Sequence, residues 1–261
     1  MMGIVAGSDK KLAFWGDSKM NAYFNLNIPT HYGETQRRKP HVIGERAIGK
    51  YNPAVFEARF VQSNVSIKGF FQSWKYFWNI TDQIRSMFVF KSEIRTPAEE
   101  ITRELRALYY KRSKRHPILV AIHVRRGDVL DERRVRHGFV TPPAEYYVNA
   151  MTYFAKKFAD EHLLFVVTSN DMTWAEQNIR APVNSNTQLE YMYPNNTEAL
   201  DLAIMASCDH VIMSVGTFSW WAAFLAGGVT VYYDKWPLPG SMLGSKIVHA
   251  DFFPPHWIPM H

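Results

Sequence analysis

The sequence predicts an α/β fold whose C-terminal part forms a doubly wound parallel sheet. Two observations predict it: from residue 117 onward, continuous apolar runs alternate with helical patterns, whereas residues 1–95 are aromatic-rich and show no clean period. Continuous apolar runs are typical of parallel strands buried on both faces, and their alternation with helices is typical of doubly wound sheets. Because 261 residues suffice for two lobes, we expect one lobe over residues 1–116 and a second over residues 117–261.

A helix is expected just before the first strand. Thr96, Pro97 and Glu99 combine an N-cap, a proline at the first helical position and a capping-box glutamate. Apolar residues then follow at helical spacing as far as Leu108, so the helix is expected to end near Arg112. The basic run that follows, residues 111–116, is interpreted as a solvated linker, with a patch for an acidic partner as the alternative.

Four strands and four helices are expected after this linker. Strands are predicted at residues 118–122, 163–167, 210–213 and 229–232. Helices are predicted from 141–145 to about 158, at 171–179, at 196–207 with residue 196 or 197 as its cap, and at 217–226. Because ligands of such sheets bind beyond the carboxyl ends of the strands, the functional residues are expected within 123–128, 168–171 and 214–219.

Charged residues follow the first predicted strand directly. His123 and Arg125 are two residues apart, so on a strand they face the same side. Arg125 and Arg126 carry guanidinium forks that suit phosphate oxygens. Gly127 lets the backbone turn sharply near a ligand, and Asp128 follows it. The segment predicts phosphate binding, and an ordinary strand end with solvated arginines is the alternative.

The next strand ends carry weaker signals. Asn170 or Asp171 either caps the following helix or contacts a nucleotide base or ribose. Small hydroxyl residues surround a glycine in residues 214–219 at a helix start, which suits an anion; simple capping beside two core tryptophans is the alternative. Asp201 lies on the preceding helix and is either a site residue or a solvated one.

The composition excludes several classes of protein. A single cysteine, Cys208, rules out a disulfide framework and a thiolate-rich metal site. No run of 18 apolar residues occurs, so no transmembrane segment is expected in this chain. The formal charge of +6 is compatible with an anionic ligand such as a nucleotide diphosphate, and the basic residues are less concentrated than in a nucleic-acid binder.

Some familiar motifs are absent from the sequence. There is no G-x-G-x-x-G, no Walker lysine loop, no G-x-S-x-G elbow and no D-x-D pair. An enzyme that acts on a nucleotide-sugar without a D-x-D pair must neutralise the diphosphate with protein cations. Arg125 and Arg126 suit that role, and no metal and no cofactor are expected.

Four segments in order carry a resemblance to a known family. They are residues 68–77 (KGFFQSWKYF), 123–128 (HVRRGD), 165–171 (FVVTSND) and 214–228 (SVGTFSWWAAFLAGG). Together they resemble the motifs of the α1,2-fucosyltransferases, the galactoside 2-alpha-L-fucosyltransferases of glycosyltransferase family 11. The H-x-R-R-G-D signature is shared with the related α1,6- and O-fucosyltransferases. The resemblance runs from about Leu12 to Trp257.

The resemblance implies a GT-B-like architecture with two Rossmann-like lobes. Residues 1–116 would be the acceptor-side lobe, and residues 117–261 would bind the donor, GDP-fucose. The implied reaction transfers L-fucose to the 2-hydroxyl of a terminal β-galactoside, with inversion and without an obligatory metal. No nucleic-acid partner is implied.

The resemblance also implies roles for individual residues. Arg125 matches the arginine that holds the donor diphosphate and stabilises the departing GDP, where a preorganised guanidinium opposes the developing charge. The resemblance does not identify a catalytic base; the carboxylates nearest in sequence are Asp128, Asp131 and Glu132, of which Asp128 is preferred, with orientation of Arg125 as its alternative role. The expected donor-binding residues are His123, Arg126, Asp171, Asp201, Thr217, Phe218 and Ser219.

The sequence departs from the family pattern at its start. Family members open with a membrane anchor and a "G-r-l-G-N-Q" loop, and this chain begins after both, so its N-terminal lobe is expected to lack a first strand. The family resides in the Golgi lumen, associated with the membrane. The N-x-S/T triplets at Asn64, Asn79 and Asn195 agree weakly with a lumenal location.

Three functions therefore compete. The first is an active α1,2-fucosyltransferase, favoured by the intact donor motifs. The second is a fucosyltransferase with a different acceptor, such as a peptide or core glycan. The third is a non-catalytic remnant that binds a GDP-sugar or glycan, favoured by the missing glycine loop. Donor binding without turnover would distinguish the third from the first.

Overall fold

The computed structural model describes residues 20–26, 41–45, 47–56, 65–182, 186–192 and 196–261. The chain divides into two compact units. Unit 1 comprises residues 1–89 and 244–255, and unit 2 comprises residues 90–243 and 256–261. Leu12, Asn64 and Asn195 lie outside the described residues.

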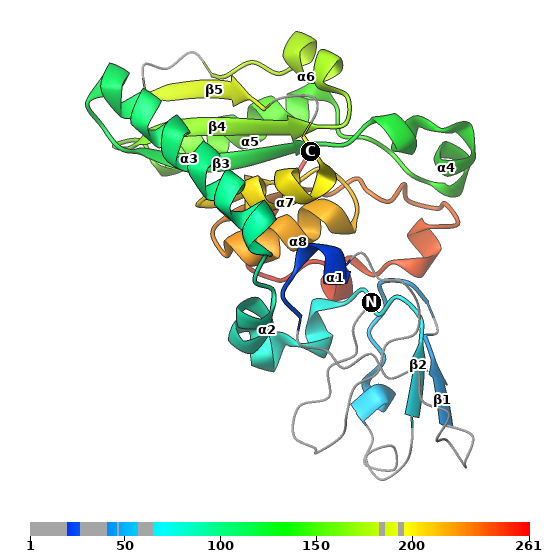
Figure 1. Cartoon of the computed structure of the whole chain (residues 1–261). Coiled ribbons are helices and arrows are strands. Elements are labelled where there is room, and N and C mark those ends of the chain that lie inside the picture. Colours follow the sequence, from blue (N-terminus) through cyan, green and yellow to red (C-terminus); the bar gives the residue numbers. More distant parts are fainter. Residues whose placement is uncertain (1–19, 27–40, 46, 57–64, 183–185, 193–195) are drawn as a thin grey trace. The chain divides into compact units, whose positions relative to one another are not determined.

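Unit 2 is built on a six-stranded parallel sheet (Figure 1). Its spatial order is β5-β4-β3-β6-β7-β8. The strands are β3 (Pro117–Val124), β4 (His162–Ser169), β5 (Thr187–Tyr191), β6 (His210–Ile212), β7 (Thr230–Tyr233) and β8 (Ile258–Met260). Counted from β3, this is the 3-2-1-4-5-6 order of the Rossmann fold, whose strand order reverses between β3 and β6. The predicted α/β class with a Rossmann-like C-terminal lobe is confirmed.

Helices cover both faces of this sheet. One face carries α3 (Ser92–Ser113), α7 (Glu198–Ala206) and α8 (Thr217–Ala226), and the other carries α5 (Ala144–Lys157) and α6 (Met172–Asn178). Alternate residues of β3 pack against the aromatic residues of α5, and the core there includes Val120, Ile122, Tyr146, Phe154 and Phe165. Each such large apolar side chain stabilises the fold by about 1.5–3 kcal/mol on burial.

The predicted elements of unit 2 fall close to the observed ones. The four predicted strands correspond to β3, β4, β6 and β7, and the four predicted helices to α5, α6, α7 and α8. Thr197 caps α7, because its side chain accepts a hydrogen bond from the backbone N–H of Leu200. Gly227 ends α8 in a left-handed conformation with φ of 75°, which glycine adopts at little cost.

Two strands and one α-helix among the described residues of unit 2 were not predicted from the sequence. They are β5, β8 and the short helix α4 (Glu132–His137). The strand β5 reads Thr-Gln-Leu-Glu-Tyr and is only partly buried, so it lacks an apolar run. A proline, Pro259, interrupts β8, which lies at an edge of the sheet where proline is tolerated.

The predicted start of the helix before β3 was wrong. Helix α3 begins at Ser92 rather than Pro97, which lies inside it. Its first turn forms on Lys91, whose carbonyl accepts hydrogen bonds from the backbone of Ile94 and Arg95. Residues 111–113, predicted as linker, form its last turn, and Lys114 ends the helix with φ of 57°.

The division between the units also differs from the predicted boundary at residues 116 and 117. Helix α3 belongs to unit 2, because it packs on α7 and β3. Residues 244–255 return to unit 1. The predicted boundary followed the change in sequence pattern at residue 117. The observed boundary near residue 90 is set instead by tertiary packing, because α3 packs with the elements of unit 2.

Unit 1 holds a two-stranded parallel sheet among its described residues. Its strands are β1 (His41–Gly44) and β2 (Val65–Lys68), with Ile43 opposite Ile67 in the register. The described helices are α1 (Met20–Tyr23), α2 (Thr81–Met87) and α9 (His249–Phe252), with 3₁₀ turns at Pro53–Phe56, Trp74–Tyr76, Trp78–Ile80 and Gly244–Lys246. A second Rossmann-like lobe stays a prediction, since residues 27–40 and 57–64 lie outside the described part.

Candidate active site

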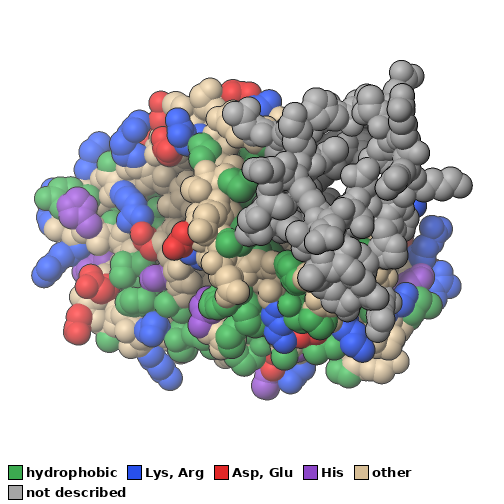
Figure 2. Space-filling model, turned by 90° about the horizontal axis from the view of Figure 1, so that it is seen from below, with side chains coloured by type: hydrophobic (Ala, Val, Ile, Leu, Met, Phe, Trp, Pro, Cys, Tyr) green, Lys and Arg blue, Asp and Glu red, His purple; other side chains and the backbone are tan. Residues whose placement is uncertain are grey.

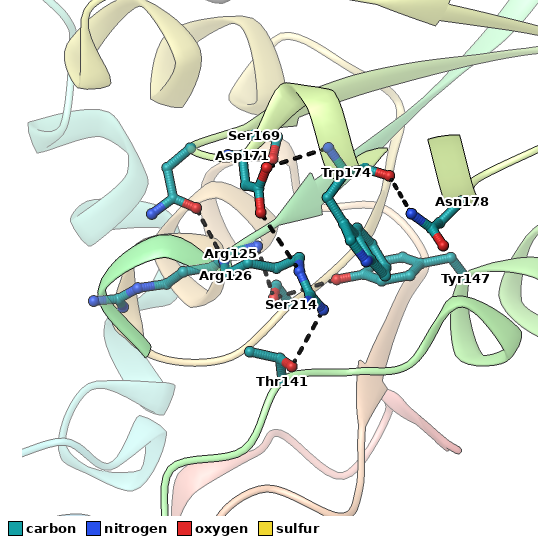
Figure 3. A network of polar contacts seen from close by, with 10 residues as sticks. Arg125, Arg126, Thr141, Tyr147, Ser169, Asp171, Trp174, Asn178 and Ser214 are labelled. Carbon is teal, nitrogen blue, oxygen red and sulfur yellow. Dashed lines mark hydrogen bonds and ion pairs between the residues drawn. The ribbon is translucent and has the colours of Figure 1, made fainter. Parts of the chain in front are cut away.

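The candidate site lies where the strand order of the unit 2 sheet reverses. Arg125 follows β3 and Ser214 follows β6, and the backbone N–H of Arg125 donates a hydrogen bond of 3.1 Å to Oγ of Ser214 (Figure 3). The hydroxyl of Tyr147, on α5, lies 3.4 Å from the same oxygen. The crevice at such a reversal is the usual ligand site of an open α/β sheet.

The side chain of Arg125 is held by Asp128. Its Nε donates to Oδ1 at 3.0 Å and its Nη2 donates to Oδ2 at 2.6 Å. Arg134, on α4, approaches Oδ2 to 3.1 Å. The hydrogen bond from Arg125, and the positive charges of Arg125 and Arg134, lower the pKa of Asp128. Asp128 is therefore an ionised carboxylate that fixes the direction of Arg125.

The remaining nitrogen of Arg125 lies beside the start of α8. A Cβ atom built on Gly216 would stand 2.7 Å from Nη1. Gly216 is the N-cap of α8, with φ of 85° and no side-chain cap. The first N–H groups of a helix attract anions. A guanidinium and a helix N-terminus therefore meet at this point, an arrangement that suits a phosphate group.

Arg126 points the other way and is enclosed (Figure 3). Its guanidinium carbon lies 3.9 Å from the ring centroid of Trp174, and its Nε lies 3.6 Å from Oδ2 of Asp171. Nη1 approaches the hydroxyl of Thr141 at 3.5 Å. Only 18% of the side chain is exposed. Its buried Nε has an ion pair but, within the part of the chain that the structure describes, no hydrogen-bond partner.

Asp171 forms the ion pair with Arg126 and also caps α6. Its Oδ1 accepts a hydrogen bond from the backbone N–H of Trp174 at 3.2 Å. The neighbouring Asn170 accepts a hydrogen bond from the backbone N–H of Arg126 at 2.9 Å. The capping interpretation of Asp171 is therefore confirmed, and Asn170 and Asp171 together tie the end of β4 to the end of β3.

His123 is buried and neutral. Its Nδ1 lies 2.7 Å from Oγ of Ser219, which is fully buried on α8, and its ring lies 5.1 Å from that of Phe218. Burial, followed by the charge of Arg125, lowers the pKa of His123 to about 3. His123 therefore contributes no positive charge and instead joins β3 to the first turn of α8.

Thr217 and Asp201 occupy the starts of two helices. Thr217 is the first residue of α8, and Asp201 lies in the first turn of α7. Among the described residues, no hydrogen bond or ion pair joins Asp201 to Arg125 or Arg126; its Oδ1 accepts from Nδ2 of Asn196 at 3.0 Å. Burial raises the pKa of Asp201 to about 6.

Sequence reasoning missed several residues of this site. Ser214 and Asn170 lay in the expected segments, but their bonds to the backbone of the two arginines were not foreseen. Trp174, Thr141 and Arg134 carry no signal in the sequence, because each reaches the site from a separate element. The sequence also did not show that Asn170 favours glycine at position 127. A Cβ atom on Gly127 would lie 3.0 Å from Nδ2 of Asn170.

The described residues contain no group of three or more His, Cys, Asp or Glu side chains placed to hold a metal ion. None of the described helices is both long and apolar enough to cross a membrane. On the face drawn in Figure 2, the coloured basic side chains are interspersed with acidic and apolar ones. Nucleic-acid binders more often concentrate theirs in a patch or stripe.

The fold and the arrangement of these residues define a Rossmann-like α/β protein with arginine side chains at the switch point of its parallel sheet. Residues 18–261 match the family model described as Glycosyl transferase family 11. The chain therefore belongs to glycosyltransferase family 11.

Curated relatives agree with this family. The galactoside alpha-(1,2)-fucosyltransferase 1 of Saimiri sciureus is 36% identical over 199 residues, covering 74% of this chain and 52% of that protein. The protein of the same name from Leontocebus fuscicollis is 34% identical over 198 residues, with the same coverage. The chain spans about half the length of these relatives.

Solved structures show only a distant likeness. A crystal structure of POFUT1 in complex with GDP has a TM-score of 0.41 and 14% identity, covering 65% of this chain and 54% of that one. A second has a TM-score of 0.40 and 16% identity, covering 62% and 52%.

Proposed function

We propose that this chain transfers L-fucose from GDP-fucose to the 2-hydroxyl of a terminal β-galactoside, with inversion and without an obligatory metal. Membership of family 11 and the names of its relatives support the donor and the acceptor class. The expected division of labour accompanies this proposal: the N-terminal lobe binds the acceptor and the C-terminal lobe binds GDP-fucose. We also propose that the protein acts in the Golgi lumen, as the family resemblance implies.

One observation carries the proposal: Nη1 of Arg125 lies beside Gly216, the uncapped start of α8. Both groups present positive electrostatic potential, and both suit the oxygens of a diphosphate. Asp128 occupies Nε and Nη2 of the same guanidinium. Among the described residues Nη1 has no hydrogen-bond partner, so it is available to a ligand.

The proposed reaction is a single displacement. The acceptor 2-hydroxyl oxygen bonds to the anomeric carbon of fucose from the face opposite GDP, the bond from that carbon to the β-phosphate oxygen breaks, and the hydroxyl proton passes to a base. Negative charge grows on the departing phosphate, and the fixed guanidinium of Arg125 opposes it there. Removing one such preorganised donor typically costs a factor of about 10²–10³ in rate.

Asp128 suits the orienting role better than the base. Both of its oxygens are bound by arginine, and its lowered pKa makes it a weak proton acceptor. His123, with a pKa of about 3, stays neutral and buried. We propose that His123, Ser219 and Phe218 fix the position of α8, so that the N–H groups of Thr217 and its neighbours face the diphosphate.

The test is acceptor-dependent release of GDP from GDP-fucose, with and without EDTA, together with a direct titration of GDP. Arg125→Ala is the test variant and Arg133→Ala, an exposed arginine on α4, is the matched control. We expect release that survives EDTA, falls by a factor of roughly 10²–10³ in Arg125→Ala and is unchanged in Arg133→Ala.

Other outcomes would point elsewhere. GDP binding without release from any β-galactoside would favour the non-catalytic remnant. Release with a peptide or core glycan but with no β-galactoside would favour a fucosyltransferase of different specificity. Loss of release in EDTA, restored by a divalent cation, would contradict metal independence.

A further inference from the structure

Segment 70–78 of unit 1 presents aromatic side chains at the surface. Phe70 is 55% exposed and Trp78 is 43% exposed. Phe71 and Tyr76 are partly exposed, and their ring centroids lie 5.5 Å apart. Removal of apolar surface from water is favourable. A ligand that covers the exposed rings of this short segment would therefore gain binding free energy.

The segment is fixed by residues distant in the sequence. Nζ of Lys75 lies 2.6 Å from Oδ1 of Asp251, on α9. The hydroxyl of Ser73 donates to the backbone carbonyl of Asp251 at 2.6 Å, and Oδ2 of Asp251 accepts from the backbone N–H of Tyr51 at 2.9 Å. Asp251 therefore connects its own segment to Tyr51 and to segment 70–78. These contacts fix the backbone that carries the exposed rings.

A carboxylate lies at the start of this segment. The backbone N–H of Phe70 donates a hydrogen bond of 2.5 Å to Oε2 of Glu45. Gly69 makes this approach possible, since a Cβ there would lie 2.2 Å from Cβ of Glu45 and 3.2 Å from Cε2 of Phe71. The carboxylate of Glu45 and the ring of Phe71 thus lie against the same glycine.

Two features of this corner are unusual for a purely structural contact. Oε1 of Glu45 is buried and has no hydrogen-bond partner among the described residues, although buried polar atoms are nearly always satisfied. Phe71 has φ of 48°, a left-handed conformation that non-glycine residues seldom adopt. Strained backbone of this kind is concentrated at functional sites.

We propose that Glu45, Phe70 and Phe71 form a carbohydrate subsite that binds the galactose ring of the acceptor. The inference rests on the proposed function, which supplies a galactoside as the substrate. An aromatic ring covers the apolar face of a hexose, and the carboxylate of Glu45 accepts a hydrogen bond from a sugar hydroxyl.

The chemistry of the corner fits a neutral sugar. The axial 4-hydroxyl of galactose leaves H3, H4 and H5 on one continuous apolar face, and aromatic side chains supply rigid apolar area for such a face. The carboxylate of Glu45 adds an acceptor for hydroxyl groups. Its negative charge repels phosphate, and the basic Lys75 is already paired with Asp251, so the corner does not suit a nucleotide.

The test is saturation-transfer NMR of methyl β-galactoside with the full chain, supported by a titration that yields the dissociation constant. We expect the strongest transfer to H3, H4 and H5. Phe70→Ala removes an exposed ring and is expected to weaken binding roughly tenfold. Tyr110→Ala, which removes a ring 41% exposed on α3 of unit 2, is the matched control and is expected to change nothing.

The variant Glu45→Gln distinguishes a role of Glu45 in sugar binding from a purely structural role. The amide oxygen of glutamine can still accept from the N–H of Phe70, so a merely structural Glu45 would tolerate the change. A carboxylate that receives a sugar hydroxyl would not, and we expect binding to weaken by roughly tenfold. Circular dichroism and thermal unfolding confirm that each variant is folded.

A parallel GDP titration separates this inference from the proposed function. If the chain binds GDP and the galactoside, and Phe70→Ala and Glu45→Gln weaken only the galactoside, the subsite is supported. If GDP binds but the galactoside does not, or binds equally well to Phe70→Ala, the subsite is overturned and the donor site stands. Galactoside binding that depends on Phe70 in a chain that fails to bind GDP would support the subsite and contradict the proposed transfer.

Discussion

The guanidinium of Arg125 lies so close to Gly216 that a Cβ atom built on the glycine would stand 2.7 Å from Nη1. The two residues come from the ends of β3 and β6, at the reversal of strand order. Gly216 also has φ of 85°, so both its conformation and its neighbour favour glycine. This pair places a guanidinium held by Asp128 against the start of α8, and its disruption is a direct test.

Gly216→Ala is expected to weaken GDP binding by a factor of roughly 10–100, because the new methyl group displaces Nη1. The measurement is a calorimetric titration with GDP. The variant is also expected to lose about 1 kcal/mol of unfolding free energy from its left-handed backbone.

Gly227→Ala is the matched control, since Gly227 has φ of 75° at the other end of α8. It is expected to lose similar stability and to bind GDP as tightly as the unaltered chain. Equal GDP affinity in both variants would show that the contact with Arg125 is unimportant.

Asp128→Asn is expected to raise KM for GDP-fucose roughly tenfold, because the bidentate pair that orients Arg125 is lost. The acid limb of the pH dependence of kcat is expected to stay unchanged. The measurement is a pair of pH–rate profiles. A fall in kcat by a factor of about 10²–10⁴ with loss of the acid limb would instead identify Asp128 as the base.

The lowered pKa of Asp128 also links stability to pH. The folded state favours the ionised carboxylate, so this contribution is present above the usual pKa of aspartate. It is lost as the pH falls through the lowered pKa of the folded state. Asp128→Asn is expected to be less stable than the unaltered chain at neutral pH and to approach it in acid, as urea unfolding at several pH values would reveal.

Asp201→Asn is expected to stabilise the protein at pH 7.5. Burial raises the pKa of Asp201 from 3.8 to about 6, so the folded state favours the protonated form. Stability is lost as the pH rises through 6, by about 2–3 kcal/mol at most. Urea unfolding at pH 4 and 7.5 should show a gain for the variant only at the higher pH, and an equal gain at both would contradict this account. A GDP titration of the same variant tests the expected donor contact.

Arg126→Lys is expected to act mainly on stability. A lysine loses the stacking on Trp174 and the planar reach to Thr141 and Asp171, at a cost of about 1 kcal/mol in unfolding free energy. The GDP affinity should fall less than in Arg125→Ala. If the variant unfolds normally but loses GDP as severely as Arg125→Ala does, Arg126 contacts the diphosphate directly. Arg133→Lys is the control.

Much of unit 2 could be predicted from its sequence. The apolar runs 118–122 and 163–167 identify β3 and β4 because strands buried on both faces must be apolar throughout. Thr197 and Gly227 mark helix ends because capping is a local interaction. Strand β5 escaped prediction because it is half-exposed, and the start of α3 was misplaced because Pro97 mimics a first helical residue.

The sequence by itself determined the parallel α/β sheet of unit 2 and the segment that carries Arg125 and Arg126. The reason is that apolar runs and helix caps involve residues close together in the sequence. Only the tertiary structure decided that Arg125 faces the start of α8 while Arg126 is enclosed by Trp174, that His123 is neutral, and that Asp251 returns to hold Lys75. The hydrogen bond of Arg125 to Ser214 spans 89 residues and the pair of Lys75 with Asp251 spans 176. Contacts of that range depend on how the elements pack, which no local pattern records.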